Sequence, residues 1–359
     1  MIISIFLAAD VTSVAHAEEV DSEIVIEASS GRVLYEKNAD TRRYIASLTK
    51  IMSAIISIEN SDISREIVVP AKCCGIEGSS IYLQPNERLT IEQLLYGLML
   101  RSGNDCAETL AVAISGSVEN FAELMNKKAA ELGASNTHFV NPHGLYDGEN
   151  YSTAKDMAII TAYAMRDQTF RKIVSTKSIV IPNTVTGQNR YLKNKNKLLF
   201  NYEDCIGVKT GYTKKAGRCL ASAAKSNDME LISVVLGCGP MYEVSQNNFE
   251  KAFSEYKMVD ICNEKEFEYT ADFGGTNCAV GNITKGFRYP LKESEINKIE
   301  KVVEIDETII LPLKKGDKIG NLKIYLENQL LFSSEIYTII DVGKKFDITE
   351  PIKNWNVGE

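Results

Sequence analysis

Ser47 and Lys50, with two residues between them, have the types and spacing that nucleophilic catalysis requires. A serine hydroxyl is a weak nucleophile and needs a base close by. Residues i and i+3 share one face of a helix, so a helix that begins at Ser47 places the lysine amine one turn away. The apolar neighbours Ile45, Ile51 and Met52 favour a desolvated amine with a lowered pKa. Taken alone, such a pair is more often a serine helix cap beside a solvated lysine.

Two further groups of residues carry hydroxyl, amide and ammonium side chains. Ser102-Gly103-Asn104 lies between two helical runs, where a loop presents a hydroxyl and an amide to a cleft. Lys209-Thr210-Gly211 ends a strand-like run. A strand edge pairs readily with an extended peptide, and the glycine lets the peptide backbone approach closely. Each group alone is more simply explained as a helix cap or a strand end.

Taken together, the three groups follow the order S-x-x-K, S-x-N, K-T-G. This order is typical of class A β-lactamases and penicillin-binding proteins, with Gly103 here in place of the aspartate of the middle motif. The sequence resembles the low-molecular-mass penicillin-binding proteins that are serine-type D-alanyl-D-alanine carboxypeptidases. The resemblance runs from residue 23 to residue 258 and continues more weakly at 312–317. It is carried by residues 45–52, 100–105, 141–145, 152–157 and 208–217.

The resemblance implies a role for each residue of the first two groups. Ser47 is the acylated nucleophile, and Lys50 is its general base. Ser102 and Asn104 pass protons and hold the amide of the substrate. The backbone N–H groups of Ser47 and Tyr212 form the oxyanion hole, which stabilises the developing negative charge.

The resemblance further implies that the third group binds the substrate. Lys209 attracts the terminal carboxylate and keeps Lys50 neutral by like-charge repulsion, while Thr210 binds the carboxylate beside Gly211. The expected substrate is a peptidoglycan stem peptide that ends in D-Ala-D-Ala, from which terminal D-Ala is released. β-Lactam antibiotics mimic this terminus and are the expected inhibitors. Neither a metal nor an organic cofactor is implied.

The order of predicted elements favours an α+β catalytic domain with one sheet and a helical lobe. The resemblance implies that this sheet is antiparallel and has flanking helices. The resemblance makes this a β-lactamase/DD-peptidase-like fold. Thr90, Ser117 and Thr153 are predicted to cap helices. In the catalytic domain we expect a hairpin at 23–35, helices at 47–59 and 241–258, a mainly helical region at 90–165, and strands at 178–181, 205–211, 218–224 and 230–236. In a small C-terminal all-β domain we expect strands at 301–305, 308–313, 318–326 and 336–342.

The chain is expected to consist of four parts: a signal peptide at 1–17, the catalytic domain at 18–260, the β domain at 261–343 and a tail at 344–359. Ala15-His16-Ala17 fits the small-x-small pattern of signal-peptide cleavage. We therefore expect an exported protein in the cell wall or at the outer face of the cell membrane. The tail has little apolar area and contains Pro351, so we expect at most weak peripheral membrane contact.

The composition excludes several classes of function. A net charge of -8 argues against a general nucleic-acid binder. The chain has 3 histidines, and His16 falls in the predicted signal peptide, so a histidine-rich metal site is excluded. None of the 8 cysteines forms a C-x-x-C pair, and free buried thiols are the simplest interpretation of most of them.

Two other functions stay open at this point. A β-lactamase needs a glutamate that activates the deacylating water, and Glu149 is the nearest candidate by position. A catalytically silent penicillin-binding sensor is disfavoured because the reactive residues of all three groups are intact. We interpret His143 as structural rather than catalytic. Arg218 adds positive charge near the substrate carboxylate only if its side chain points towards the site.

Overall fold

The computed structural model describes residues 21–264, 268–272, 278–306 and 308–343. The chain divides into two compact units, Met1–Ser254 and Glu255–Glu359. The predicted signal peptide at 1–17 and the tail at 344–359 lie outside the described residues. Within the described ranges, no helix combines the length and the hydrophobicity of a membrane span.

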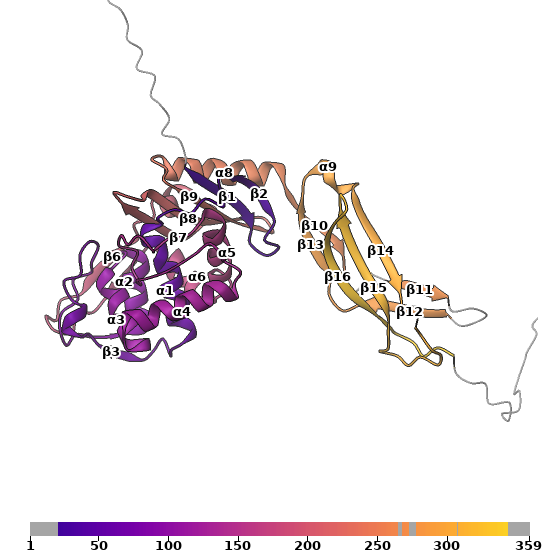
Figure 1. The fold of residues 1–359 in the computed structure, drawn as a ribbon, viewed down its shortest axis with the longest axis horizontal. Helices are drawn as coiled ribbons and strands as arrows, with labels where there is room; N and C mark the ends of the chain where they lie inside the picture. The colour runs from indigo at the N-terminus through magenta and orange to yellow at the C-terminus, as the bar shows by residue number, and fades with distance from the viewer. Residues whose placement is uncertain (1–20, 265–267, 273–277, 307, 344–359) are drawn as a thin grey trace, which may run out of the picture. The chain divides into compact units, whose positions relative to one another are not determined.

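A five-stranded antiparallel sheet forms the frame of the first unit (Figure 1). Its strands are β1 (Ser22–Glu27), β2 (Val33–Lys37), β7 (Cys205–Thr213), β8 (Gly217–Ser226) and β9 (Met229–Leu236). The predicted N-terminal hairpin is confirmed, because β1 pairs with β2. The strand order is β2-β1-β9-β8-β7, so the strand that carries Lys209, Thr210 and Gly211 lies at the sheet edge.

Helices pack on the sheet and on one another. α5 (Ala154–Ala164) contacts β1, β8 and β9, and α6 (Gln168–Ser175) contacts β7. α8 (Met241–Glu255) runs along the sheet in Figure 1, and Asn248 of α8 donates to Glu23 of β1 at 2.9 Å. α1 (Thr49–Glu59) contacts α2, α3, α4, α5 and α6, and its residues from Thr49 to Ser57 are buried. This central helix therefore fixes its first turn, where Lys50 lies, in the apolar core.

The helix caps predicted from the sequence are confirmed. The helices of the helical lobe are α2 (Ile91–Leu100), α3 (Asn104–Ser115) and α4 (Val118–Glu131). Thr90 and Gln93 form a capping box at α2, Ser117 caps α4, and Thr153 caps α5. Two short hairpins complete the unit: β3 (Glu66–Val68) pairs with β4 (Arg88–Thr90), and β5 (Ser178–Ile181) pairs with β6 (Arg190–Lys193). The remaining elements are the 3-10 turns η1 (Ala46–Leu48) and η2 (Ala71–Cys73) and the short helix α7 (Leu198–Asn201).

Where the structure describes it, the second unit is built from strands, as predicted, with one short helix, and has its own apolar core. Its five-stranded sheet has the order β11-β12-β16-β15-β14, and β10 pairs with β13. Glu327 and Asn328 both have positive φ, as a tight hairpin turn requires. The elements are β10 (Lys257–Cys262), β11 (Tyr269–Asp272), β12 (Cys278–Ile283), β13 (Phe287–Leu291), α9 (Glu293–Ile296), β14 (Ile299–Ile305), β15 (Lys318–Leu326) and β16 (Gln329–Thr338).

Three predicted elements differ clearly from the observed ones. The helix predicted at 241–258 ends at Glu255, because the next residues form β10 and pair with β13. The strand predicted at 308–313 is not formed: Pro312 has no N–H to donate, and only Leu313 makes a bridge, to Val342. The strand predicted at 336–342 instead runs from Gln329 to Thr338, where the Thr338 hydroxyl accepts from the N–H of Ile340 and the chain turns.

Candidate active site

Ser47 lies in the 3-10 turn η1, directly before α1. Leu48 is the N-cap residue of α1 and no side chain caps the helix, so Ser47 is not a helix cap. Two glycines let neighbouring backbone approach this turn. Gly144 has a φ of +82°, and a Cβ there would overlap the carbonyl oxygen of Ala46. A Cβ on Gly211 would lie 3.2 Å from the backbone nitrogen of Ser47.

Lys50 is completely buried and points its amine at the serine. Its Nζ lies 3.2 Å from the Oγ of Ser47, 2.7 Å from the Oδ1 of Asn104 and 2.5 Å from the carbonyl oxygen of His143. Burial, and then the positive charge of Lys209, hold the pKa of Lys50 well below its usual value. The lysine is therefore suited to accept a proton from the Ser47 hydroxyl.

Lys209 is a second buried lysine, with 1% of its surface exposed. It lies on β7, and its Nζ donates to the carbonyl oxygen of Thr210 at 2.9 Å. Burial, and then the charge of Lys195, lower the pKa of Lys209 to about 7. Near neutral pH the amine of Lys209 is therefore only partly protonated, and it lies close to the base of the site.

Ser102 and Asn104 lie at the start of α3, as the inter-helix position predicted. Ser102 has a φ of +65°, and both side chains are buried. The amide of Asn104 accepts from Lys50 and donates to the carbonyl oxygen of Glu77 at 2.5 Å. The side chain of Asn104 thus connects the amine of Lys50 to the loop around residue 79.

A pocket of about 390 Å³ brings most of the predicted residues together. Lys50, Asn104 and Lys209 are buried and do not themselves line it. Arg218 also lines the pocket, opposite Tyr212 in the β7–β8 ladder, which answers the open question of its direction. The lining residues are Ser47, Ser79, Ser102, Lys195, Thr210, Gly211, Tyr212, Arg218, Met241 and Tyr242.

Sequence reasoning missed four of the lining residues: Ser79, Lys195, Met241 and Tyr242. Lys195 donates to the Oγ of Ser79 at 2.9 Å and accepts from the hydroxyl of Tyr242 through its carbonyl oxygen. Lys195 stands in a lysine- and asparagine-rich run that is typical of a solvated loop. None of the four belongs to a motif with its own spacing, so only the fold reveals them.

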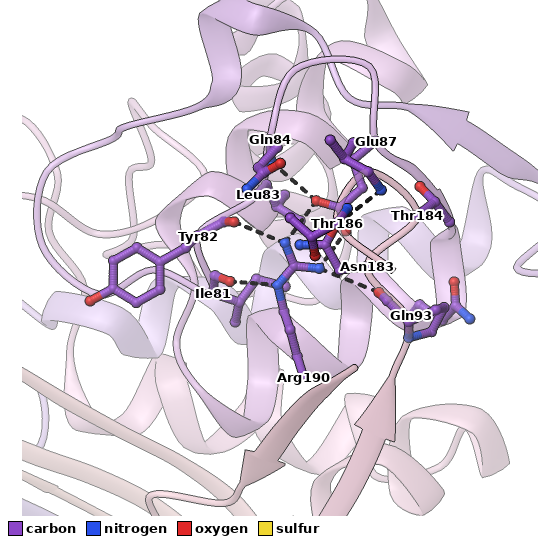
Figure 2. A network of polar contacts seen from close by, with 12 residues as sticks. Ile81, Tyr82, Leu83, Gln84, Glu87, Gln93, Asn183, Thr184, Thr186 and Arg190 are labelled. Carbon is purple, nitrogen blue, oxygen red and sulfur yellow. Dashed lines mark hydrogen bonds and ion pairs between the residues drawn. The ribbon is translucent and has the colours of Figure 1, made fainter. Parts of the chain in front are cut away.

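Two buried carboxylates hold the loop that carries Ser79. Asp105 accepts from the hydroxyl of Ser80 at 2.6 Å and from the N–H of Leu83 at 3.0 Å. On the other side, Glu87 is fully buried and forms an ion pair with Arg190, as Figure 2 shows.

Arg190 completes the attachment of this loop. Its Nε donates to the carbonyl oxygen of Ile81 at 2.8 Å, and its Nη2 donates to that of Tyr82 at 2.9 Å (Figure 2). Because Arg190 starts β6, the loop is tied to the β5–β6 hairpin as well as to α3. These contacts fix the position of Ser79 at the pocket.

The side chains of the other candidates point away from the reacting groups. The Nε2 of His143 lies 3.2 Å from Glu108, and burial lowers the pKa of the imidazole; His143 contacts Lys50 only through its carbonyl oxygen. Glu149 lines a different cleft. No disulfide joins the eight cysteines, of which six are buried. Within the described residues, no three His, Cys, Asp or Glu side chains are grouped as metal ligands.

Comparison with known proteins identifies two regions of the chain. Residues 10–239 match the family model described as D-alanyl-D-alanine carboxypeptidase. Residues 277–344 match the model of the penicillin-binding protein 5 C-terminal domain.

Individual relatives extend over almost the whole chain. The D-alanyl-D-alanine carboxypeptidase DacF of Bacillus subtilis is 32% identical, over 93% of this chain and 88% of the relative. DacA of Haemophilus influenzae is also 32% identical, over 89% of this chain and 84% of the relative. The crystal structure of penicillin-binding protein 5 from Haemophilus influenzae aligns with a TM-score of 0.75 at 29% identity, covering 90% of this chain and 98% of that chain. The chain therefore belongs to the D-alanyl-D-alanine carboxypeptidase family.

Proposed function

We propose that this protein removes the terminal D-Ala from peptidoglycan stem peptides through an acyl-enzyme on Ser47. The observation that carries the proposal is the buried amine of Lys50, 3.2 Å from the Ser47 hydroxyl, with its pKa held well below the usual value. A neutral amine at this position can take the hydroxyl proton at physiological pH.

Acylation proceeds from this pair. Lys50 takes the proton as the Oγ of Ser47 attacks the carbonyl carbon of the penultimate D-Ala. The N–H groups of Ser47 and Tyr212 stabilise the oxyanion, which is supported by the close approach of Gly211 to the Ser47 turn. The C–N bond then breaks, and the leaving amine of terminal D-Ala receives a proton through Ser102. Water hydrolyses the resulting ester and regenerates Ser47.

Positive charge in the pocket accounts for the preference for a free C-terminus. Lys209 lies behind Thr210, while Lys195 and Arg218 line the pocket itself. A terminal carboxylate placed beside the hydroxyl of Thr210 is therefore attracted by three cations. Asn104 is buried, and its amide is held by Lys50 and the carbonyl oxygen of Glu77, so it positions the amine of Lys50 beside the substrate site.

One assay tests this function. The full chain and Ser47→Ala are incubated with a peptide ending in Lys-D-Ala-D-Ala and, separately, with a fluorescent penicillin. We expect the wild-type protein to release D-Ala and to retain the label, and the variant to do neither. If the wild-type protein releases no D-Ala and takes no label, the proposal is wrong.

The same assay separates the alternatives. A β-lactamase would turn over penicillin rapidly, but no carboxylate is among the residues that line the described pocket, and Glu149 lies in the other cleft. A silent sensor would take the label without releasing D-Ala. The depressed pKa of Lys50 favours catalysis over the sensor, since simple binding needs no base.

We further propose that the protein acts outside the cytoplasmic membrane, where its polymeric substrate lies, and that residues 1–17 direct its export. Cell fractionation of the full chain and of a chain without residues 1–17 tests this. The full chain is expected with the envelope fraction and the shortened chain in the cytoplasm. Removal of residues 344–359 is expected to change envelope association little, because this tail adds at most weak membrane contact.

A further inference from the structure

A second cleft, of about 550 Å³, has no role in the acyl transfer described above. Three segments form most of it: the residues that precede the Ser47 turn, the loop around Glu149 and the tip of the β7–β8 hairpin. It has aromatic and charged walls, to which Arg42, Tyr44, Tyr151 and Lys215 contribute.

This cleft continues the catalytic pocket along β7. Tyr44 lies three residues before Ser47, and Lys215 lies three residues after Tyr212. The two segments run side by side, because a Cβ on Gly211 would lie 3.0 Å from the carbonyl oxygen of Ile45. Lys214, Lys215 and Ala216 form a turn after β7, and three residues span at most about 10 Å, so the second cleft lies within about 10 Å of Tyr212.

The direction of the substrate follows from the proposed function, on which this inference rests. The terminal carboxylate lies at Thr210 and the reacting carbonyl lies between the N–H groups of Ser47 and Tyr212. The peptide therefore runs antiparallel to β7, a sheet edge that is open to such pairing. Its N-terminal part leads past Tyr212 towards Lys215, and a long side chain on the residue before D-Ala-D-Ala reaches the second cleft.

The charges of the cleft are only partly neutralised by the protein. Arg43 is paired with Asp21 at 3.3 Å. In contrast, the carboxylate of Glu149 has no hydrogen bond or ion pair with any described residue. Arg42 donates to the amide oxygen of Asn136, and the Nζ of Lys215 lies 5.9 Å from the ring centre of Tyr146; neither cation has an acidic partner in the described ranges.

Glu149 therefore offers an unpaired negative charge, and Arg42 and Lys215 offer two unpaired positive charges. These charges fit a ligand group that carries both an ammonium and a carboxylate. We infer that the cleft binds the side chain of the residue before D-Ala-D-Ala when this residue is a diamino dicarboxylic acid, such as diaminopimelate. Glu149 binds the side-chain ammonium, and Lys215 with Arg42 binds the side-chain carboxylate. A lysine side chain satisfies only Glu149, and an alanine side chain satisfies none of the three.

Hydrolysis of three matched peptides tests the inference. Acetyl-X-D-Ala-D-Ala is used with alanine, lysine or meso-diaminopimelate at X, and kcat and KM are measured from D-Ala release by the full chain. We expect kcat/KM to be about tenfold higher for diaminopimelate than for alanine, mainly through KM, with lysine between them. Glu149→Gln and Lys215→Gln should each reduce the ratio of diaminopimelate to alanine peptide severalfold.

Glu36→Gln and Lys127→Gln are matched controls, because each removes one exposed charge outside the cleft. Both are expected to keep the wild-type ratio. Equal kcat/KM for the three peptides, or a preference that survives both cleft variants, overturns the inference while hydrolysis of the alanine peptide upholds the proposed function. Failure to hydrolyse any of the peptides overturns both.

Discussion

Two lysines enclosed in the protein interior set the chemistry of the site at the scale of single residues. Burying an ammonium is unfavourable, so each lysine favours the neutral amine and costs the protein stability when it is protonated. Because its neutral amine is favoured, Lys50 can act as a base beside Ser47. Lys209, with a pKa of about 7, keeps part of its charge near neutral pH for a carboxylate ligand.

The stability of the protein should therefore depend on the protonation of Lys209. Its pKa is about 7 in the folded protein and 10.5 in the unfolded chain. Between these values the unfolded chain binds more protons, so this lysine makes stability rise with pH from about 7 to about 10. Below about pH 6 the folded and unfolded forms both carry the proton, and the destabilising effect of Lys209 is then complete, on the order of 5 kcal/mol.

Lys209→Met removes this titration. We expect the variant to have a higher Tm than the wild-type protein at pH 6, and the difference to shrink as the pH approaches 10. Thermal unfolding at pH 6, 8 and 9.5 measures it. Lys225→Met, an exposed lysine on the neighbouring strand β8, is the control and should show no such trend. An equal Tm difference at every pH would contradict the folded-state pKa of Lys209.

Gly144 is the residue that most directly constrains the position of the nucleophile. Gly144→Ala adds a Cβ that overlaps the carbonyl oxygen of Ala46, so η1 must move and carry Ser47 with it. We expect the rate of penicillin acylation to fall at least about tenfold, since small misplacements of reacting groups are costly. A stopped-flow measurement with fluorescent penicillin gives this rate.

Gly116→Ala is the matched control for Gly144→Ala. Gly116 has a φ of +84°, almost the same as Gly144, but a Cβ added to it would have nothing within 4 Å. Gly116→Ala should therefore lower the free energy of unfolding by about 1–2 kcal/mol through backbone strain alone and leave the acylation rate unaffected. Equal loss of acylation in the two variants would show that strain, not contact with η1, is responsible.

At the scale of elements, the loop between η2 and β4 is held by buried charges rather than by regular structure. Arg190 and Glu87 connect it to β6, and Asp105 connects it to α3. Removing one partner of a buried ion pair leaves an uncompensated charge and typically costs about 3–5 kcal/mol. An exposed pair is worth about 1 kcal/mol or less.

A double-mutant cycle on this pair tests its role. We expect Glu87→Gln and Arg190→Gln each to lower the free energy of unfolding by about 3 kcal/mol, and the double variant to lose clearly less than the sum. Both single variants should also slow acylation, because Ser79 moves with the loop. Chemical denaturation and the penicillin acylation rate are the measurements.

The ion pair between Arg88 and Glu66 is the comparison for this cycle. It joins β3 to β4 at 2.9 Å, with both side chains more than half exposed. Arg88→Gln should cost about 1 kcal/mol at most and leave acylation unchanged. Similar costs for the two pairs, or additive effects at Glu87 and Arg190, would refute the proposed role of the buried pair.

The same loop shows which elements can be predicted from the sequence. Helix caps such as Thr90 with Gln93 depend on residues three apart, so their pattern is visible in the chain itself. The loop around Ser79 has no periodicity, and its partner Arg190 is more than 100 residues away from it. The start of β10 likewise reads as helix in the sequence, because only pairing with β13 reveals it as a strand. Interactions distant in sequence leave no local pattern to find.

At the scale of the whole molecule, each of the two units has an apolar core among the residues that the structure describes. One surrounds α1 and the first sheet, and the other lies among β12, β15 and β16 of the second unit. All residues that line the catalytic pocket belong to the first unit. Penicillin that acylates Ser47 should therefore stabilise the first core without affecting the second.

Calorimetry of the full chain tests this independence. We expect two unfolding transitions, of which only one moves to higher temperature, by several degrees, after acylation by a slowly hydrolysed penicillin. In Ser47→Ala the same penicillin should move neither transition, because no covalent bond forms. A single transition that shifts as a whole would mean that the two cores unfold cooperatively, and that the second unit contributes to the stability of the catalytic one.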